Sequence, residues 1–390
     1  MTRLSICIPT RNRQRYAIDA ARHMLKSERD DFEIVIADNS DDAREIAAFR
    51  DEASDDRLKI LPPADRPLSM RENWERIIPE TRGEWITFIG DDDYVDPDLC
   101  EVIRLACERV PTVDAISWGR AYYSWPDARA PREITTLPTS SHLRGLDKKD
   151  LMKRMFFWDQ ATDRPTCPFG VYHGTIRRSL FEQIQETFSG CYFEHGNLDY
   201  DNICKTVMLA RAFVLWERPM SVFGTCIASN TMGLRDAKIS RERTRIVIED
   251  EPDGFATSPE FPFSPYLGIT AAIGHAIEHF KRKYGIDING WEENFIKACA
   301  KDCETQTDRK LFDERKAAYA KAIAEWRGQA ALTAFKPEYK YRADIPRFVG
   351  LHEDTLYIDM DMGETRSAAE YYEMIDAMLF PVNLLESRLA

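Results

Sequence analysis

Three consecutive aspartates follow a short apolar run in the first quarter of this chain. The run covers residues 85–89, Gly90 ends it, and Asp91, Asp92 and Asp93 come next. A buried strand that ends in three carboxylates gathers negative charge at the edge of a sheet, and this charge is costly unless a cation or hydrogen-bond donors offset it. Carboxylate oxygens suit Mg²⁺ or Mn²⁺, and a divalent ion bound there would be positioned to hold a diphosphate.

Two earlier apolar runs, residues 4–8 and 32–37, also end in polar residues. These residues are Pro9, Thr10, Arg11 and Asn12 after the first run, and Asp38, Asn39, Ser40 and Asp41 after the second. Taken singly, each cluster is also what a turn or a helix cap requires. In an open α/β sheet, however, ligands bind beyond the carboxyl ends of the strands, so three such ends in this order predict a binding site.

The elements that must position these residues alternate between strand and helix patterns. Expected strands are residues 4–8, 32–37, 58–61, 85–89 and 113–118, and expected helices are 13–26, 41–50, 69–78 and 96–109. Ser69 and Glu72 have the spacing of a capping box at the start of the third helix. This alternation predicts an α/β fold with a Rossmann-like, mostly parallel sheet flanked by helices.

Beyond residue 118 the pattern is mixed and then helical. Residues 213–216 and 220–223 are expected to form two strands, and the helices expected afterwards are 266–284, 291–304, 308–327 and 365–379. The short run 357–361 is interpreted as a turn before the last helix. We therefore expect one domain over 1–232, divided into halves 1–118 and 119–232, and a mostly helical C-terminal region over 233–390.

Composition narrows the class of protein. The chain has 390 residues, a net charge of -13 and 31% charged residues, so binding to the phosphates of nucleic acid is not expected. Nine cysteines without a CxxC pair indicate reduced thiols, and no apolar stretch approaches the ~20 residues of a membrane span. We expect a cytoplasmic protein without a signal peptide. The amphipathic last helix leaves open peripheral association with the inner face of the membrane and homo-oligomer formation through the C-terminal helices.

Three segments together resemble an inverting glycosyltransferase of family 2 with the GT-A fold. They are ICIPTRNR at residues 6–13, IVIADNS at 34–40 and, after Asn73 and Trp74, GEWITFIGDDD at 83–93. The resemblance covers about the first third of the chain and extends weakly to residue 230. It implies that the first half of the domain binds a nucleotide-sugar, that the second half binds the acceptor, and that the aspartates form a DxD motif.

The resemblance also implies roles for individual residues. Thr10 and Asn12 would line the nucleotide pocket, Asp38 would accept a hydrogen bond from the uracil or thymine N–H, and Asp93 would bind Mn²⁺ or Mg²⁺ together with Asp91. The donor-binding set that it implies is Pro9, Thr10, Arg11, Asn12, Asp38, Asn39, Arg71, Asn73, Asp91 and Asp92. A divalent ion there would neutralise charge on the departing nucleoside diphosphate.

An inverting transfer needs a base for the acceptor hydroxyl, and a carboxylate is the usual choice. In related enzymes this base lies roughly a hundred residues after the DxD motif, at the start of a helix. Asp199 is the first candidate here and Asp201 the second. A purely structural alternative stays open, because an aspartate at a helix N-terminus is favourable without any catalytic role.

Two further features concern the second half of the domain. Many relatives have a histidine or basic residue after the strand near 220–226, whereas this chain has GTCIASN at 224–230. Arg235, Arg241 or Arg243 could take that place. An aromatic cluster, formed by Tyr122, Tyr123 and Trp125 with Phe156, Phe157 and Trp158, could stack on an acceptor sugar or belong to the core.

The resulting prediction is a metal-dependent, inverting glycosyltransferase of the hexosyltransferase type. It would move a sugar from a UDP- or dTDP-sugar to a saccharide or glycolipid acceptor in surface polysaccharide biosynthesis. Two alternatives remain: a sugar nucleotidyltransferase, and a non-catalytic nucleotide-sugar-binding protein on the same fold. Nucleotidyltransferases usually carry a glycine-rich loop with a basic residue after the first strand, and this chain lacks it.

Overall fold

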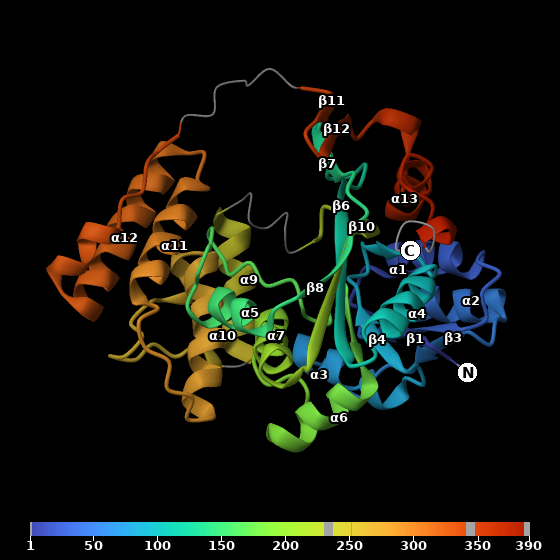
Figure 1. Ribbon diagram of the computed structural model, residues 1–390, viewed down its shortest axis with the longest axis horizontal. Coiled ribbons are helices and arrows are strands. Elements are labelled where there is room, and N and C mark those ends of the chain that lie inside the picture. Colours follow the sequence, from blue (N-terminus) through green and yellow to red (C-terminus); the bar gives the residue numbers. More distant parts are fainter. Residues whose placement is uncertain (1, 230–236, 251, 341–347, 386–390) are drawn as a thin grey trace.

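A computed structural model describes residues 2–229, 237–250, 252–340 and 348–385 of the chain. Its centre is a nine-stranded sheet of order β3-β2-β1-β4-β9-β6-β10-β5, with β8 paired to β10 (Figure 1). The strands are β1 (Leu4–Thr10), β2 (Phe32–Asp38), β3 (Leu58–Leu61), β4 (Trp85–Phe88), β5 (Tyr94–Val95), β6 (Val113–Ser124), β8 (Leu143–Leu146), β9 (Gly174–Arg177) and β10 (Ala212–Thr225). All residues of β1 and β2 are buried, which explains why most of them are apolar.

Strand directions confirm the predicted mostly parallel sheet. β1 is parallel to β2 and β4, and β2 is parallel to β3. β9 is antiparallel to both β4 and β6, so β6 and its parallel neighbour β10 run in the same direction as β1–β4. The α/β architecture expected of a GT-A domain, with helices on both faces of the sheet, is therefore present.

The helices cover two separate cores. They are α1 (Gln14–Leu25), α2 (Arg44–Ala53), α3 (Met70–Glu75), α4 (Leu99–Arg109), α5 (Lys148–Phe156), α6 (Arg178–Thr187), α7 (Leu198–Leu209), α9 (Ala237–Asp250), α10 (Ile269–Lys283), α11 (Glu292–Glu304), α12 (Arg309–Arg327) and α13 (Ala368–Asp376). Ile6 and Ile34 belong to the core that includes α1, α4 and α13, whereas Cys7 and Val35 face the core that includes α5–α7 and α10–α12.

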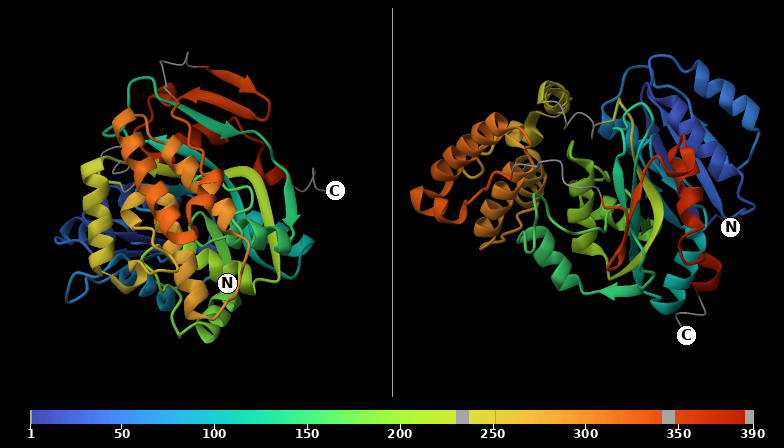
Figure 2. Two further views of the ribbon diagram at one scale, coloured as in Figure 1. Left: turned by 90° about the vertical axis from the view of Figure 1, so that its left-hand side faces the viewer. Right: turned by 90° about the horizontal axis from the view of Figure 1, so that it is seen from above.

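The described helices of the C-terminal region lie on two opposite sides of the sheet. Helices α10–α12 pack together on one side of the sheet, and α13 lies on the opposite side, next to α1 and β10 (Figures 1 and 2). Between them, β11 (Gly350–His352) and β12 (Thr355–Asp359) form a small antiparallel sheet with β7 (Ile134–Pro138). The predicted helical extension is present in α10–α12, while the division of the chain into domains stays a prediction.

Local predictions were right for most of the first half and wrong at two places in the second. The capping box of Ser69 and Glu72 is formed as expected. Residues 213–216 and 220–223 are not two strands but parts of β10, which continues through irregular pairing around Pro219. Residues 357–361 are not a turn, because the first three of them belong to β12. No helix of the described residues is long and apolar enough to cross a membrane.

Candidate functional site

The carboxyl ends of β1, β2 and β4 meet at one edge of the sheet. The register pairs Thr10 with Asp38 and Cys7 with Phe88, so the loop after β4 lies beside the end of β1. The Thr10 hydroxyl donates a hydrogen bond to Asp91 over 2.8 Å. The structure therefore brings together the three polar strand ends that the sequence singled out.

Arg13, the residue just before α1, is the main cation at this edge. Its guanidinium lies 2.7 Å from Asp91 Oδ1, donates through Nε to Asp91 Oδ2 over 3.0 Å, and lies 3.9 Å from Asp92. Sequence reasoning included Arg13 in the first motif but gave it no role. Its position could have indicated this role, because Arg13 ends the loop between β1 and α1 and the aspartates follow the neighbouring strand β4.

The loops after β1 and β2 are tied to each other. Asn12 has a φ of 57°, its amide donates to Asp41 over 2.9 Å, and its backbone N–H donates to the Ser40 hydroxyl over 2.6 Å. Ser40 in turn donates through its backbone N–H to the buried carboxylate of Asp38 over 3.0 Å. Asn12 and Asp38 are therefore fixed by the same small network at the predicted nucleotide pocket.

Asn39 and Asn73 connect this edge to the segment around α3. The Asn39 side chain donates to the Leu68 carbonyl over 2.8 Å and accepts from the Leu68 N–H over 2.9 Å. The Asn73 amide donates to the Ala37 carbonyl over 3.1 Å and accepts from Arg76 over 2.9 Å. Both side chains are buried, and these contacts give them a role in shaping the strand ends.

A hollow of about 910 Å³ opens beside these loops. Arg11, Asn12 and Arg71 line it from the α/β part, and Ile246 lines it from α9. Pro9, by contrast, lies inside β1 and is buried with the rest of that strand. Through Asn12, the hollow adjoins the network around Asp38.

Asp93 is the most completely bonded of the three aspartates. It accepts hydrogen bonds from the N–H of Gly90 (2.7 Å), the Tyr172 hydroxyl (2.8 Å), His173 Nε2 (2.8 Å) and the N–H of Gly224 (2.7 Å). Burial by itself would raise the pKa of Asp93, but His173 and the other donors outweigh it and hold the pKa below its usual value. Burial lowers the pKa of His173, against the opposing attraction of the Asp93 carboxylate.

Asp91 and Asp92 are less well compensated. Burial raises the pKa of Asp91 to about 6, against the opposing effect of Arg13. Burial, followed by repulsion from Asp93 and Asp91, raises the pKa of Asp92 to about 7. Among the residues that the structure describes, the Asp92 side chain accepts one hydrogen bond, from the Cys226 N–H over 3.1 Å. Uncompensated negative charge therefore concentrates on Asp92.

Backbone N–H groups at the end of β10 stand where relatives were expected to have a basic side chain. Gly224 and Cys226 donate to Asp93 and Asp92, and a Cβ on Gly224 would lie 1.6 Å from the Asp92 carbonyl oxygen. Only glycine fits this contact. Arg235, like the side chains of Arg241 and Arg243, lies outside the described residues.

Asp199 lies at the start of α7 and is close enough to Asp93 and Arg120 for their charges to affect it. Burial raises the pKa of Asp199 to about 6, Arg120 lowers it, and Asp93 adds to the increase. Among the described residues, no hydrogen bond or ion pair to the Asp199 carboxylate is found. This carboxylate is therefore free to accept a proton.

Asp201, unlike Asp199, is bonded to other protein groups. Its carboxylate accepts from the Glu194 N–H over 2.7 Å and from Lys205 over 2.9 Å. Lys205, which is fully buried, also lies 2.8 Å from the Glu194 carboxylate and donates to the Tyr192 carbonyl over 2.7 Å. Asp201 is thus part of a buried ion-pair network that fixes the start of α7.

The present contacts of the three strand-end aspartates decide which of them could bind Mn²⁺ or Mg²⁺. No group of three or more candidate ligands is found within the described part of the chain. Asp93 uses both oxygens for protein donors, whereas Asp92 leaves Oδ1 without one and bears a charge that a cation would relieve. A divalent ion held by one or two carboxylates and completed by substrate phosphates is common, and Asp91 and Asp92 fit that arrangement.

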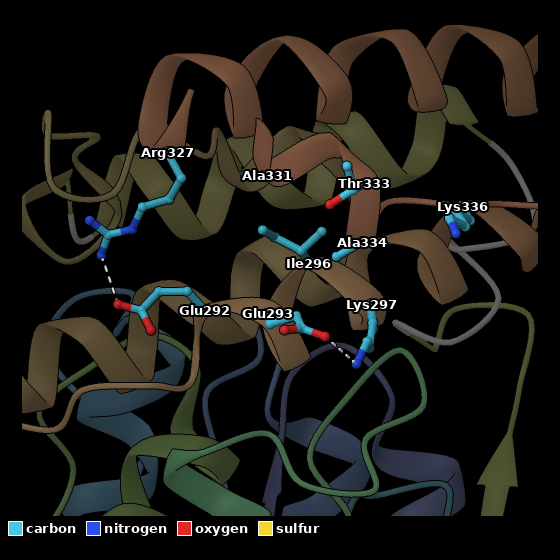
Figure 3. Close-up of a pocket in the computed structure, with 9 residues that line it drawn as sticks. All are labelled: Glu292, Glu293, Ile296, Lys297, Arg327, Ala331, Thr333, Ala334 and Lys336. Atoms are coloured by element: carbon cyan, nitrogen blue, oxygen red, sulfur yellow. Dashed lines mark hydrogen bonds and ion pairs between the residues drawn. The ribbon is translucent and has the colours of Figure 1, made fainter. Parts of the chain in front are cut away.

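Another hollow, of about 720 Å³, lies far from these carboxylates among α11, α12 and the turn that follows (Figure 3). Two ion pairs line it: Arg327 lies 3.0 Å from Glu292, and Lys297 lies 2.6 Å from Glu293. Ile296 lies between these pairs, and Lys336 also lines the hollow.

Comparison with known families gives a match over the first half of the chain. The family model described as "Glycosyl transferase family 2" matches residues 5–185, which include β1, β2, β4 and the three aspartates.

Individual relatives match shorter stretches. The chain is 30% identical over 112 residues to the putative glycosyltransferase EpsH of Bacillus subtilis, covering 28% of this chain and 32% of that protein. It is 30% identical over 94 residues to the GalNAc(5)-diNAcBac-PP-undecaprenol beta-1,3-glucosyltransferase of Campylobacter jejuni, covering 24% and 30%. The chain thus spans about a third of the length of these curated relatives. Among solved structures, S. aureus TarS 1-349 in complex with UDP-GlcNAc aligns over 86% of this chain and 89% of its own, with a TM-score of 0.46 and 12% identity.

Proposed function

We propose that this protein is a glycosyltransferase, because residues 5–185 match the model of glycosyl transferase family 2. It transfers a hexose from a UDP- or dTDP-sugar to a hydroxyl of a saccharide or glycolipid acceptor, with inversion at the anomeric carbon. The setting we propose is the assembly of surface polysaccharide or glycolipid.

The observation that carries this proposal is that one site contains two carboxylates with different surroundings, Asp92 and Asp199. Asp92 has a charge without sufficient protein donors, as a partner for a metal–diphosphate requires. Among the described residues, the Asp199 carboxylate has no hydrogen bond or ion pair, and the charge of Asp93 affects its pKa. A nucleotide-binding edge beside a free base supports group transfer from a nucleotide-sugar.

On the donor side, Asp38 and the hollow beside Asn12 would hold the base. Asp38 is buried, and a carboxylate suits the N–H of uracil or thymine. Asp91, held by Thr10 and Arg13, would face the ribose or the sugar. Arg11 and Arg71 line the same hollow and would contribute positive charge near the phosphates.

Asp91 and Asp92 would hold the divalent ion, and Asp93 would stabilise the loop that carries them. When bound, the ion would neutralise charge on the nucleoside diphosphate as it leaves. This assignment shifts the metal ligand from Asp93 to Asp92, because the oxygens of Asp93 already accept four protein hydrogen bonds.

On the acceptor side, Asp199 acts as the general base. It removes the proton of the acceptor hydroxyl while that oxygen bonds to the anomeric carbon and the bond from this carbon to the phosphate oxygen breaks. Attack from the face opposite the leaving group inverts the configuration. A pKa near 6 leaves the Asp199 carboxylate ionised at neutral pH and more basic than an ordinary aspartate.

The test is a pair of substitutions, Asp199→Asn and Asp201→Asn. We expect Asp199→Asn to lower transfer about 10³-fold while the binding of UDP with Mn²⁺, followed by thermal shift, stays unchanged. Asp201→Asn should instead lower the melting temperature, because it disturbs the buried Lys205 network.

Two results would contradict the proposal. One is full transfer by Asp199→Asn. The other is release of pyrophosphate from UTP and a sugar 1-phosphate by the wild type, which would identify a nucleotidyltransferase instead.

A further inference from the structure

Two side chains of β6 face the site without taking part in the proposed chemistry. Tyr122 is 50% exposed and Arg120 is half-buried, whereas their neighbours Ala121 and Tyr123 are buried in the core on the other face of the sheet. The expected aromatic cluster thus divides: Tyr123, like Trp125, Phe156 and Trp158, belongs to the core, and Tyr122 is open to solvent.

Strand pairing shows which surface these two residues share. Arg120 lies opposite Ser221 and Tyr122 opposite Phe223, and side chains at paired positions lie on the same face of a sheet. The Tyr122 and Phe223 rings are 5.9 Å apart, and the Phe223 and His173 rings 5.4 Å apart. Since His173 bonds Asp93, this aromatic surface continues directly to the strand-end aspartates.

Arg120 is a cation without an anionic partner of its own. In the part of the chain that the structure describes, no carboxylate is paired with its guanidinium, although its charge reaches Asp199 and His173. A half-buried guanidinium with planar donors is suited to bind a carboxylate or a phosphate. Its position beside the proposed base, rather than beside Asp38, assigns that anion to the acceptor.

We propose that the acceptor is an anionic saccharide whose carboxylate or phosphate binds Arg120 and whose sugar ring packs on Tyr122 and Phe223. This inference rests on the proposed function, because it takes Asp199 as the group that contacts the acceptor hydroxyl. The aromatic surface binds the apolar face of the ring, and Arg120 selects for charge. The overall charge of -13 would repel such an acceptor elsewhere, so a single well-placed cation gives the site its selectivity.

The test uses three probes of one ring type: methyl glucoside, methyl glucuronide and methyl glucoside 6-phosphate. Binding to the full chain with UDP and Mn²⁺ is measured by saturation-transfer NMR titration. We expect at least one anionic probe to bind about tenfold more tightly than the neutral one, and the carboxylate and phosphate arms show which anion is preferred.

Variants separate charge from packing. Arg120→Met should remove the preference for the anionic probe, Arg120→Lys should keep part of it, and Tyr122→Ala should weaken all three probes alike. Arg144→Met, which removes an exposed arginine of β8 that pairs with Glu217, is the matched control and should change nothing.

Equal binding of the three probes, or no binding by any of them, would overturn the inference. It would equally be overturned if Arg120→Met weakened UDP binding and left the probe preference intact, because Arg120 would then serve the donor. Failure of the proposed function appears differently: UDP with Mn²⁺ would not stabilise the wild type, while the probe preference could still be measured.

Discussion

Asp92 and Asp93 are adjacent in sequence but have opposite electrostatic surroundings. Asp93 accepts four hydrogen bonds, and its pKa is lowered by His173 despite burial. Asp92 accepts one hydrogen bond, and burial raises its pKa to about 7. A folded-state pKa above that of the unfolded chain means that the folded protein binds the proton more tightly. The stability linked to Asp92 is therefore lost as pH rises from about 4 to 7, whereas Asp93 contributes stability that is lost as pH falls.

Neutral substitutions at the two positions should accordingly have opposite effects. At pH 8 without divalent ions, Asp92→Asn should raise the free energy of unfolding by about 1–3 kcal/mol, because a buried charge is removed. Asp93→Asn should lower it by a similar amount, since an amide cannot replace a carboxylate that accepts four donors. Urea unfolding at pH 8 measures the change in the free energy of unfolding for both variants. Changes of the same sign would contradict the opposite surroundings of Asp92 and Asp93.

The same pair separates the metal site from its support. Mn²⁺ with UDP should raise the melting temperature of the wild type and of a variant elsewhere on the surface, but not that of Asp92→Asn. An unchanged Mn²⁺ response in Asp92→Asn would return the metal to Asp93.

We expect protonation of Asp199 to cause the loss of activity at low pH. Its pKa of about 6 predicts that transfer is lost as pH falls through 6, where the base becomes protonated. Because the charge of Arg120 lowers this pKa, Arg120→Met should move the acid limb to higher pH, and Arg120→Lys should leave it nearly in place. Rates of transfer between pH 5 and 8 give the pH dependence. If the rate falls at the same pH in wild type and Arg120→Met, Arg120 does not affect the pKa of Asp199.

At the scale of elements, β10 completes the site with its backbone. Its end brings the N–H groups of Gly224 and Cys226 onto Asp93 and Asp92. Such a contact depends on the close approach of two chain segments, and a side chain on Gly224 would prevent it. The strand therefore serves both as structure and as a source of donors.

Gly224→Ala tests this contact. Its Cβ would meet the Asp92 carbonyl at 1.6 Å, so we expect a loss of at least about 3 kcal/mol in the free energy of unfolding, or failure to fold. Gly145→Ala on β8 is the matched control, because its Cβ would have only an ordinary contact at 3.8 Å. Denaturant unfolding of both variants gives the comparison, and equal stability would contradict the close approach.

Local sequence patterns were sufficient for the elements whose stability is mostly local. The buried runs of β1, β2 and β4 and the capping box at Ser69 were predictable because burial and capping leave direct traces in sequence. β12 was missed, since its partner β7 lies more than two hundred residues earlier and neither segment alternates clearly. His173 was missed for a similar reason: only the folding of β9 beside β4 brings it to Asp93.

At the scale of the whole molecule, the C-terminal segment returns to the sheet. Tyr371, Tyr372 and Ile375 of α13 are buried in the same core as β1 and β6, and the buried Arg218 of β10 donates to the Phe380 carbonyl over 2.7 Å. This segment thus closes one face of the α/β part, while α10–α12 pack on the other (Figure 2).

Truncation tests that role. A chain ending at residue 340 should lose at least about 3 kcal/mol of stability or fail to fold, because large aromatic side chains leave the core. The chain of residues 1–390 is the reference. Thermal unfolding of both chains measures this, and equal melting temperatures would contradict the role of α13.

The return of α13 also has a consequence for how the protein is made. A ribosome releases the strands of the sheet long before the tyrosines that must cover one of its faces. During that interval the nascent α/β part exposes an apolar surface that is covered only when α13 has been made. The first half of the chain therefore becomes stable only after α13 has been synthesised, and premature termination before α13 should yield aggregates rather than a smaller enzyme.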